Sequence, residues 1–380
     1  MSDKKSESPA EIASGDAALK SDSPKHHNSF TALRWLFALF VVFTHSFALA
    51  GQENAAPLLL GRSLASWGVL GFFILSGYLN SGSVHRNANN LGAAAFLLRR
   101  AFRILPLLWI TTLAGTVIFW SLDGLTKWTV PAGVQFWAGN SLLYQPHFTL
   151  GSIFSRNLNT AFCGSIWTLP YEAAFYVIIA TGGLGRLRGA AWMPHAILVA
   201  LFSGMFLTAS GSAPPWFGGI QSYYVGLFGF AFLCGMALMN FKAVLQSRWT
   251  LLVSTAIFAS SAGLQLAKFP GGEMLQMAAF AVLVLRIGQL RGGAVSRWAG
   301  RWDASYGIYL FSFPIQQALI ALGIRNPHHI FLLSSILSAT GGLVSWQFLE
   351  KPMLGVGKRL STRLLMRQEA TRAPGLASKI

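Results

Sequence analysis

A histidine and an arginine lie eleven residues apart in the first long apolar segment, FTALRWLFALFVVFTHSFALA. Eleven helical steps of about 100° come close to three full turns, so the side chains of Arg34 and His45 share one face, roughly 16 Å apart along the axis. An ionisable group at membrane depth is by default a candidate for function. His45 could act as a general base or as a nucleophile. The alternative is a histidine that only hydrogen-bonds a neighbouring helix.

A second group of cationic residues lies in the segment FLLRRAFRILPLLW. Arg100 and Arg103 are three residues apart, so they share a face if the segment is helical. A guanidinium group can bind phosphate through two parallel hydrogen bonds, and two such groups on one face suit a phosphorylated ligand. The alternative is a positive-inside signal that only orients the neighbouring span.

The segment CGSIWTLPYEAAFY places an acidic residue beside aromatic residues. Glu172 directly follows Tyr171 and lies five residues after Trp167. A carboxylate at this position could orient or charge-pair a catalytic histidine. We expect Trp167 and Tyr171 to bind substrate. The alternative for Glu172 is an interfacial residue that faces water.

The composition indicates a membrane protein. Of the 380 residues, 53% are hydrophobic and only 11% are charged, whereas soluble domains carry about 25% charged residues. The net charge of +17 comes from short segments between apolar runs, which favours anionic phospholipid headgroups and a phosphorylated ligand over nucleic acid as partners. The two cysteines, Cys163 and Cys234, resemble neither a disulfide framework nor a zinc ligand set, so we expect no metal.

The apolar runs predict an all-α fold: a polytopic bundle of about ten transmembrane helices. With the N-terminus in the cytoplasm, alternating spans leave 24 of the 29 lysines and arginines on the inner side, in agreement with the positive-inside rule. Both termini are then cytoplasmic, with a disordered tail at 1–29, a membrane domain at 30–350 and a basic tail at 351–380. The expected spans are approximately 31–50, 66–81, 104–122, 166–182, 192–209, 222–241, 250–266, 273–290, 303–322 and 329–349.

One loop, residues 123–165, is expected to lie outside and is rich in aromatic residues. Its stretch Val134–Tyr144 is apolar but too short to span a bilayer, so we expect a re-entrant or interfacial segment. The aromatic side chains fit either a belt at the membrane interface or a platform for sugar rings.

Six segments resemble, in order, the motifs of the acyltransferase 3 family, integral membrane enzymes that acylate cell-surface polysaccharides. They cover about residues 30–360 and read FTALRWLFALFVVFTHS, GVLGFFILSGYL, RRAFRILP, GSIWTLPYEAAFY, ASYGIYLFSFPI and SWQFLEKPM. Two positions depart from the family's pattern. Leu70 stands where the second motif often has a polar residue, and Leu108 stands where a tyrosine often precedes the tryptophan.

The resemblance implies an O-acyltransferase of the inner cell membrane, which moves an acyl group from cytoplasmic acyl-CoA to a hydroxyl of an extracytoplasmic sugar or polysaccharide. Acetyl-CoA is the expected donor substrate, and no permanently bound cofactor is expected. Arg100 and Arg103 would bind the CoA phosphates, with Arg34 at the same anionic end. His45 would be the general base or the acyl-accepting nucleophile, and Glu172 would orient it or balance its charge.

Transport is the main competing function, because ionisable residues inside spans also line substrate paths. Transporters and flippases are often built from inverted repeats with paired broken helices. The sequence shows no visible internal repeat, and His45 has no counterpart in the second half of the chain. A non-enzymatic sensor or assembly partner is a third alternative. The motifs therefore favour the enzyme.

Overall fold

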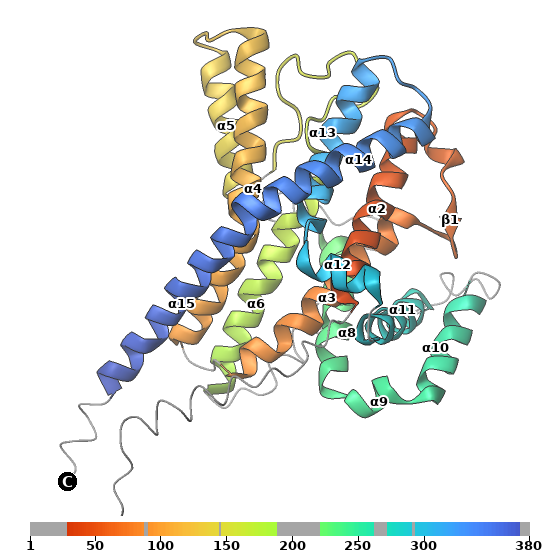
Figure 1. Ribbon diagram of the computed structural model, residues 1–380, viewed down its shortest axis with the longest axis vertical. Helices are drawn as coiled ribbons and strands as arrows, with labels where there is room; N and C mark the ends of the chain where they lie inside the picture. Colours follow the sequence, from red (N-terminus) through yellow and green to blue (C-terminus); the bar gives the residue numbers. More distant parts are fainter. Residues whose placement is uncertain are drawn as a thin grey trace, which may run out of the picture.

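The computed structural model describes residues 29–86, 90–143, 146–187, 221–261, 272–290 and 293–372. Helices make up most of these ranges, which confirms the all-α prediction. The strands in the described part are β1 (Leu58–Leu59) and β2 (Arg62–Ser63), which form a short antiparallel hairpin. Figure 1 shows a central group of helices from which one long helix extends toward the C-terminus.

Three helices form the centre of the bundle: α2 (Phe30–Leu49), α3 (Leu64–Arg86) and α8 (Ser222–Asn240). Glycines let α3 and α8 approach closely. A Cβ on Gly77 would lie 1.9 Å from the carbonyl oxygen of Phe232, and a Cβ on Gly235 would lie 2.1 Å from that of Ile74. Small residues allow this close backbone approach between helices in a membrane. The contact holds α3 in place, and α3 contributes to both cavities described below.

Helix α4 (Asn90–Asp123) is longer than the span predicted at 104–122. Its 34 residues extend roughly 50 Å at 1.5 Å per residue, which exceeds the roughly 30 Å of a bilayer's hydrocarbon core. The additional turns include the arginine segment. Arg100 and Arg103 are therefore helical and share a face, as predicted. Pro106 lies inside the helix and removes one backbone hydrogen bond.

The loop after α4 folds back as α5 (Thr129–Ser141), which packs antiparallel to the second half of α4. Trp120 Nε1 donates to the carbonyl oxygen of Thr129 at 2.9 Å, and Trp109 Nε1 donates to that of Ser141 at 3.2 Å. Helix α5 has 13 residues, too few to span a bilayer. This length agrees with the predicted re-entrant or interfacial segment.

The last helices form one continuous rod in Figure 1: α14 (Pro327–Ser345), the π-helical turn η5 (Trp346–Glu350) and α15 (Lys351–Arg372). The N–H of Lys351 donates to the carbonyl oxygen of Trp346, five residues earlier, which defines the π turn. Helix α15 packs along α4. The predicted basic tail, 351–380, therefore starts as a helix that contacts the bundle.

Other helices in the described part complete the bundle, and α13 matters most among them for the site because it packs against both α2 and α14. A Cβ on Gly307 would lie 2.6 Å from the Cα of Gly342, so glycine is needed where α13 meets α14. The helices of the described part that were not named above are η1 (Glu53–Ala55), η2 (Gly164–Thr168), α6 (Leu169–Leu187), α9 (Lys242–Gln246), α10 (Arg248–Ser260), α11 (Gly272–Gln289), α12 (Ala294–Arg301) and α13 (Ser305–Ala321).

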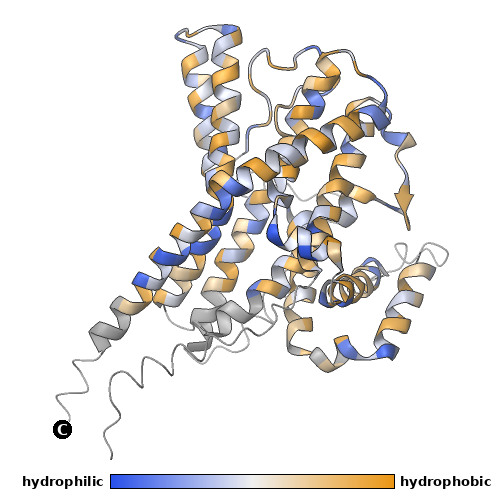
Figure 2. Ribbon diagram, in the orientation of Figure 1, coloured by the Kyte–Doolittle hydropathy of each residue, from blue (hydrophilic) through white to orange (hydrophobic). Residues whose placement is uncertain are grey.

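Three segments of the described chain are helices long and apolar enough to cross a membrane: Phe30–Leu49, Leu91–Asp123 and Pro327–Met366. The apolar helical segments Leu64–Asn80 and Tyr223–Met239 are shorter. Hydrophobic residues dominate the central helices in Figure 2, and hydrophilic residues return along α15. The predicted span 192–209 lies outside the described residues, so the number of ten spans stays a prediction.

Candidate active site

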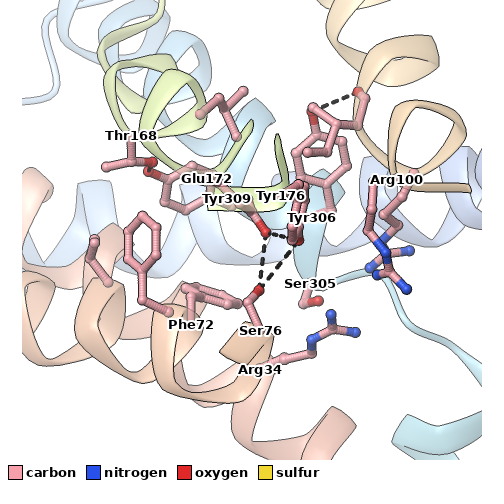
Figure 3. Close-up of a pocket in the computed structure, with 15 residues that line it drawn as sticks. Arg34, Phe72, Ser76, Arg100, Thr168, Glu172, Tyr176, Ser305, Tyr306 and Tyr309 are labelled. Atoms are coloured by element: carbon pink, nitrogen blue, oxygen red, sulfur yellow. Dashed lines mark hydrogen bonds between the residues drawn. The ribbon is translucent and has the colours of Figure 1, made fainter. Parts of the chain in front are cut away.

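A cavity of about 710 Å³, counting its open mouth, is lined by residues of α2, α3, α4, α6 and α13. We call it the arginine cavity. It brings together four residues predicted from the sequence: Arg34, Arg100, Arg103 and Glu172. The arginines come from α2 and α4, and Glu172 comes from the first turn of α6. Figure 3 shows these side chains around the cavity.

Two of the three arginines share one carboxylate. Nη1 of Arg34 and Nη2 of Arg103 each lie 2.9 Å from Oδ2 of Asp303, and Ser305 Oγ donates to Oδ1 at 2.8 Å. Two guanidinium groups at this distance favour the ionised form of the Asp303 carboxyl. Asp303 is therefore an ionised anchor, placed between α12 and α13, that holds α2 and α4 together.

Arg103 has a second acidic partner, on the C-terminal rod. Its Nη1 lies 3.4 Å from Oε2 of Glu350, whose Oε1 accepts a hydrogen bond from Ser345 Oγ at 2.8 Å. The Arg103 guanidinium also lies over the Trp346 ring, 5.7 Å from its centroid. The Glu350 side chain is only 2% exposed, and a charge buried to this extent requires a partner. Arg103 is thus held by a carboxylate on each side.

Sequence reasoning did not predict Asp303 and Glu350 as site residues. A signal was present, because the chain contains only 12 acidic residues. Glu350 lies within the motif SWQFLEKPM, and Asp303 directly precedes the motif ASYGIYLFSFPI. An acidic residue at the end of an apolar run is a candidate partner for a neighbouring arginine.

Arg100 differs from the other two arginines. Its guanidinium lies over the rings of Phe96 and Tyr176, 5.6 and 5.7 Å from their centroids. Its Nε is buried without a hydrogen-bond partner. Within the described ranges, no carboxylate forms an ion pair with it. Arg100 is therefore the arginine in this cavity that is available to an anionic ligand.

Glu172 is bonded within the arginine cavity. Its Oε1 accepts hydrogen bonds from Ser76 Oγ at 3.1 Å and from the Tyr176 hydroxyl. The hydroxyl groups of Ser76 and Tyr176 are 3.5 Å apart, so the three side chains form the closed triangle seen in Figure 3. These bonds connect Glu172 to α3 and to the next turn of α6. Its predicted effect on His45 stays a prediction.

His45 lies in a second cavity, of about 540 Å³ counting its mouth, which Trp167 also lines. We call it the histidine cavity. The imidazole packs edge-on against Phe313, with 5.4 Å between ring centroids. Its Nδ1 is buried and has no hydrogen-bond partner in the part of the chain that the structure describes. His45 therefore lines the histidine cavity with an imidazole whose Nδ1 no described residue engages.

Aromatic rings form one wall of the histidine cavity. Trp167 packs against Tyr224 and Phe228, at centroid distances of 4.7 and 5.6 Å. The predicted substrate residue Tyr171 lies behind this wall and lines neither cavity. Its ring contacts Trp167 at 6.0 Å, and its hydroxyl accepts a hydrogen bond from the Gln221 N–H at 2.9 Å. Tyr171 therefore supports the wall from behind. Tyr224 lines the histidine cavity, and the sequence analysis did not predict it as a site residue.

The two cavities adjoin. Val69 of α3 and Tyr309 of α13 line both of them. Both cavities also meet α2, since Arg34 lines one of them and His45 lines the other. The predicted site is therefore divided between two chambers with a shared wall.

A family model described as an acyltransferase domain matches residues 27–346. The protein belongs to this acyltransferase family. The resemblance noted in the sequence is thereby confirmed, and the protein is an acyltransferase. The matched range includes every predicted site residue and Asp303, and it ends shortly before Glu350.

The acyltransferase is also similar to two named proteins over most of its length. One is "O-acetyl transferase" of Shigella phage Sf6, 27% identical over 337 residues, which are 86% of this chain and 96% of that protein. The other is "Nodulation protein 10" of Rhizobium leguminosarum bv. viciae, 23% identical over 366 residues, which are 90% and 97% of the two chains. No solved structure matches the acyltransferase. The similarity to the two relatives thus extends far beyond single motifs.

Proposed function

We propose that the protein is a membrane O-acyltransferase that moves an acetyl group from cytoplasmic acetyl-CoA to a hydroxyl of an extracytoplasmic sugar or polysaccharide. The observation that carries this proposal is the pair of adjoining cavities. One contains an arginine without a carboxylate partner among the described residues, and the other is lined by a histidine whose Nδ1 has no hydrogen-bond partner among them. If donor and acceptor are held on either side of the His45 imidazole, the transfer takes place within one complex and needs no further collision of two molecules.

The donor's anionic end belongs in the arginine cavity. We assign the first contact with the CoA phosphates to Arg100, because its guanidinium has no carboxylate partner among the described residues. Arg103 and Arg34 lie beside it and are held in place by Asp303. Charge-assisted hydrogen bonds from guanidinium to phosphate are strong enough to anchor such a ligand. Glu172 would act on this side by holding Ser76 and Tyr176 in position.

The acceptor belongs in the histidine cavity. Its wall presents Trp167, Tyr224 and Phe228, and aromatic faces bury the apolar faces of sugar rings. The name of the phage relative supports acetyl as the group transferred and oxygen as the atom that receives it. A hydroxyl held on this wall would face the imidazole of His45, which lines the same cavity.

His45 can perform the transfer by either of two routes. As a general base, Nε2 takes the hydroxyl proton while the oxygen attacks the thioester carbonyl; the C–S bond then breaks and the leaving thiolate takes the proton from the imidazolium. As a nucleophile, Nε2 itself attacks the carbonyl and the C–S bond breaks, which leaves an acylimidazolium and the CoA thiolate. The sugar oxygen then attacks the acyl carbon, the C–N bond breaks, and the hydroxyl proton passes to the thiolate. Both routes end with a sugar ester, a CoA thiol and a neutral His45.

The proposed setting is the inner cell membrane, with about ten spans and both termini in the cytoplasm. The apolar helices and the concentration of basic residues in short segments support it. The reaction then joins a cytoplasmic donor to an external acceptor through the bundle.

Membranes containing the protein, incubated with acetyl-CoA radiolabelled in the acetyl group, test this function. We expect label in the surface glycan, and none with membranes from cells that lack the gene. Unlabelled glycan together with uptake of a solute would support the transporter or flippase instead. Mass spectrometry of the labelled glycan would then identify the sugar and the position that carries the ester.

A further inference from the structure

The wall between the two cavities contains one large ring. Val69 and Tyr309 line both sides of it, and the Tyr309 side chain is 6% exposed. Among the described residues, these two side chains are the lining that the cavities share, so the direct path for a thioester from Arg100 to His45 crosses this wall. Because the acyl group is at the opposite end of acyl-CoA from the phosphates, it is the first part of the donor to pass the wall.

The Tyr309 ring is held from two directions. Its hydroxyl lies 2.8 Å from the hydroxyl of Thr168 in η2, a hydrogen bond drawn in Figure 3. Its ring packs edge-on against Phe72 of α3, with centroids 5.9 Å apart. The other shared residue, Val69, has a short β-branched side chain with one preferred rotamer in a helix, so it has little freedom to move aside. Tyr309 is the side chain whose rotation would open the wall.

We propose that Tyr309 determines which acyl groups the enzyme transfers, because its ring limits the passage from the arginine cavity to the histidine cavity. The inference rests on the proposed function. An acetyl group presents a single methyl beyond the carbonyl, whereas a butyryl group presents two further methylenes that must fit past the ring. Each methylene excluded from a tight apolar passage changes specificity by roughly tenfold or more. Tyr309 thus selects short acyl groups and takes no part in bond making.

The test compares acetyl-CoA with butyryl-CoA as donors for membranes containing the wild-type enzyme, Tyr309→Ala and Tyr309→Phe. We expect the wild-type enzyme to prefer acetyl by at least about tenfold and Tyr309→Ala to lower that preference by about tenfold. Tyr309→Phe keeps the ring but loses the bond to Thr168, so its preference should fall between the other two. An unchanged preference in Tyr309→Ala would overturn the proposal. So would a loss of acetyl transfer of about 100-fold in Tyr309→Phe, because that loss would assign the hydroxyl to the chemistry.

The matched control is Tyr306→Ala. Tyr306 lies one turn before Tyr309 on α13 and lines the arginine cavity but not the histidine cavity. Its removal should leave the acetyl preference unchanged even if the overall rate falls, and an equal drop in preference would overturn the role of the shared wall. If Tyr309→Ala does not fold in detergent, Tyr309→Leu replaces it in the test. Its preference for acetyl-CoA over butyryl-CoA should also be lower than that of the wild-type enzyme, and an unchanged preference would overturn the proposal. Absence of transfer from both donors by the wild-type enzyme would refute the proposed function itself, which is a distinct result.

Discussion

The arginine cavity and the histidine cavity are built in different ways. In the arginine cavity, ion pairs and hydrogen bonds fix most charged side chains: Asp303 holds two arginines and Glu350 holds one of them from the other side. In the histidine cavity, packed aromatic rings form the wall, and the buried Nδ1 of His45 has no partner among the described residues. The arginine cavity, where we propose that the donor binds, is therefore organised by charge, and the histidine cavity, proposed for the acceptor, by shape.

Removal of the histidine is the change with the largest expected effect. His45→Ala should lower acyl transfer by at least about 100-fold, because either route needs a nitrogen of its imidazole. The fold should persist, since the imidazole makes no hydrogen bond that the structure records. Incorporation of labelled acetyl measures the effect, and detergent-purified protein of unchanged size confirms the fold.

His329→Ala is the matched control for this variant, because His329 is exposed at the start of α14 and lines neither cavity. Wild-type transfer by well-folded His45→Ala protein would show that the histidine cavity is not where the chemistry occurs. The comparison between the two cavities would then have to be abandoned.

Removal of Arg103 should act on stability. Arg103→Ala leaves Glu350 buried without its cation and takes one partner from Asp303, and breaking such a buried pair costs about 3–5 kcal/mol. Arg100→Ala should cost much less, because Arg100 has no acidic partner in the described ranges. Thermal unfolding in detergent measures both.

A second substitution distinguishes the cause of this loss. Glu350→Gln added to Arg103→Ala should restore part of the stability, since it removes the unpaired buried charge. Equal destabilisation by Arg103→Ala and Arg100→Ala would contradict the division of the arginines into one that is paired with carboxylates and one that is available.

Removal of Arg100 should act on donor binding. Arg100→Ala should raise the KM for acetyl-CoA by about tenfold or more, because a hydrogen bond to a charged group contributes about 1.5–3 kcal/mol. The kcat should change less, since Arg100 lies in the cavity away from His45. Initial rates over a range of acetyl-CoA concentrations separate the two constants.

Arg100→Lys serves as the conservative comparison. It keeps the charge but loses the forked geometry, so its KM should lie between those of the wild-type enzyme and Arg100→Ala. A KM for acetyl-CoA that is unchanged in Arg100→Ala would place the donor's phosphates elsewhere.

The local features of the fold followed from the sequence. Helical spacing predicted that Arg100 and Arg103 share a face and that Arg34 and His45 share another, because both pairs lie within a single helix. The apolar stretch after α4 was predicted to be too short to span a bilayer, and the helix found there, α5, has 13 residues. Regular geometry within one element is enough for such predictions.

The features that depend on packing between distant elements could not be predicted in this way. Asp303 meets Arg34 across 269 positions of the chain, and spacing within a helix contains no information about that contact. Glu172 was predicted to act on His45, a role that stays a prediction, whereas its hydrogen bond to Ser76 in the arginine cavity depends on how α6 meets α3 and could not be read from spacing. Tyr309 becomes important only because α13 lies where the two cavities meet.

The π turn Trp346–Glu350 also sets the rotational phase of the C-terminal helix. Its extra residue turns Glu350 toward Arg103 while α14 and α15 continue as one rod. Deletion of a single residue from this turn would rotate α15 by about 100° relative to α14. The carboxylate would then point away from α4, although no side chain of the cavity had been changed. Apart from Trp346 and Glu350, which contact Arg103, the residues in this turn matter less for their identity than for their number, and chain length at this point is itself a requirement for the arginine cavity.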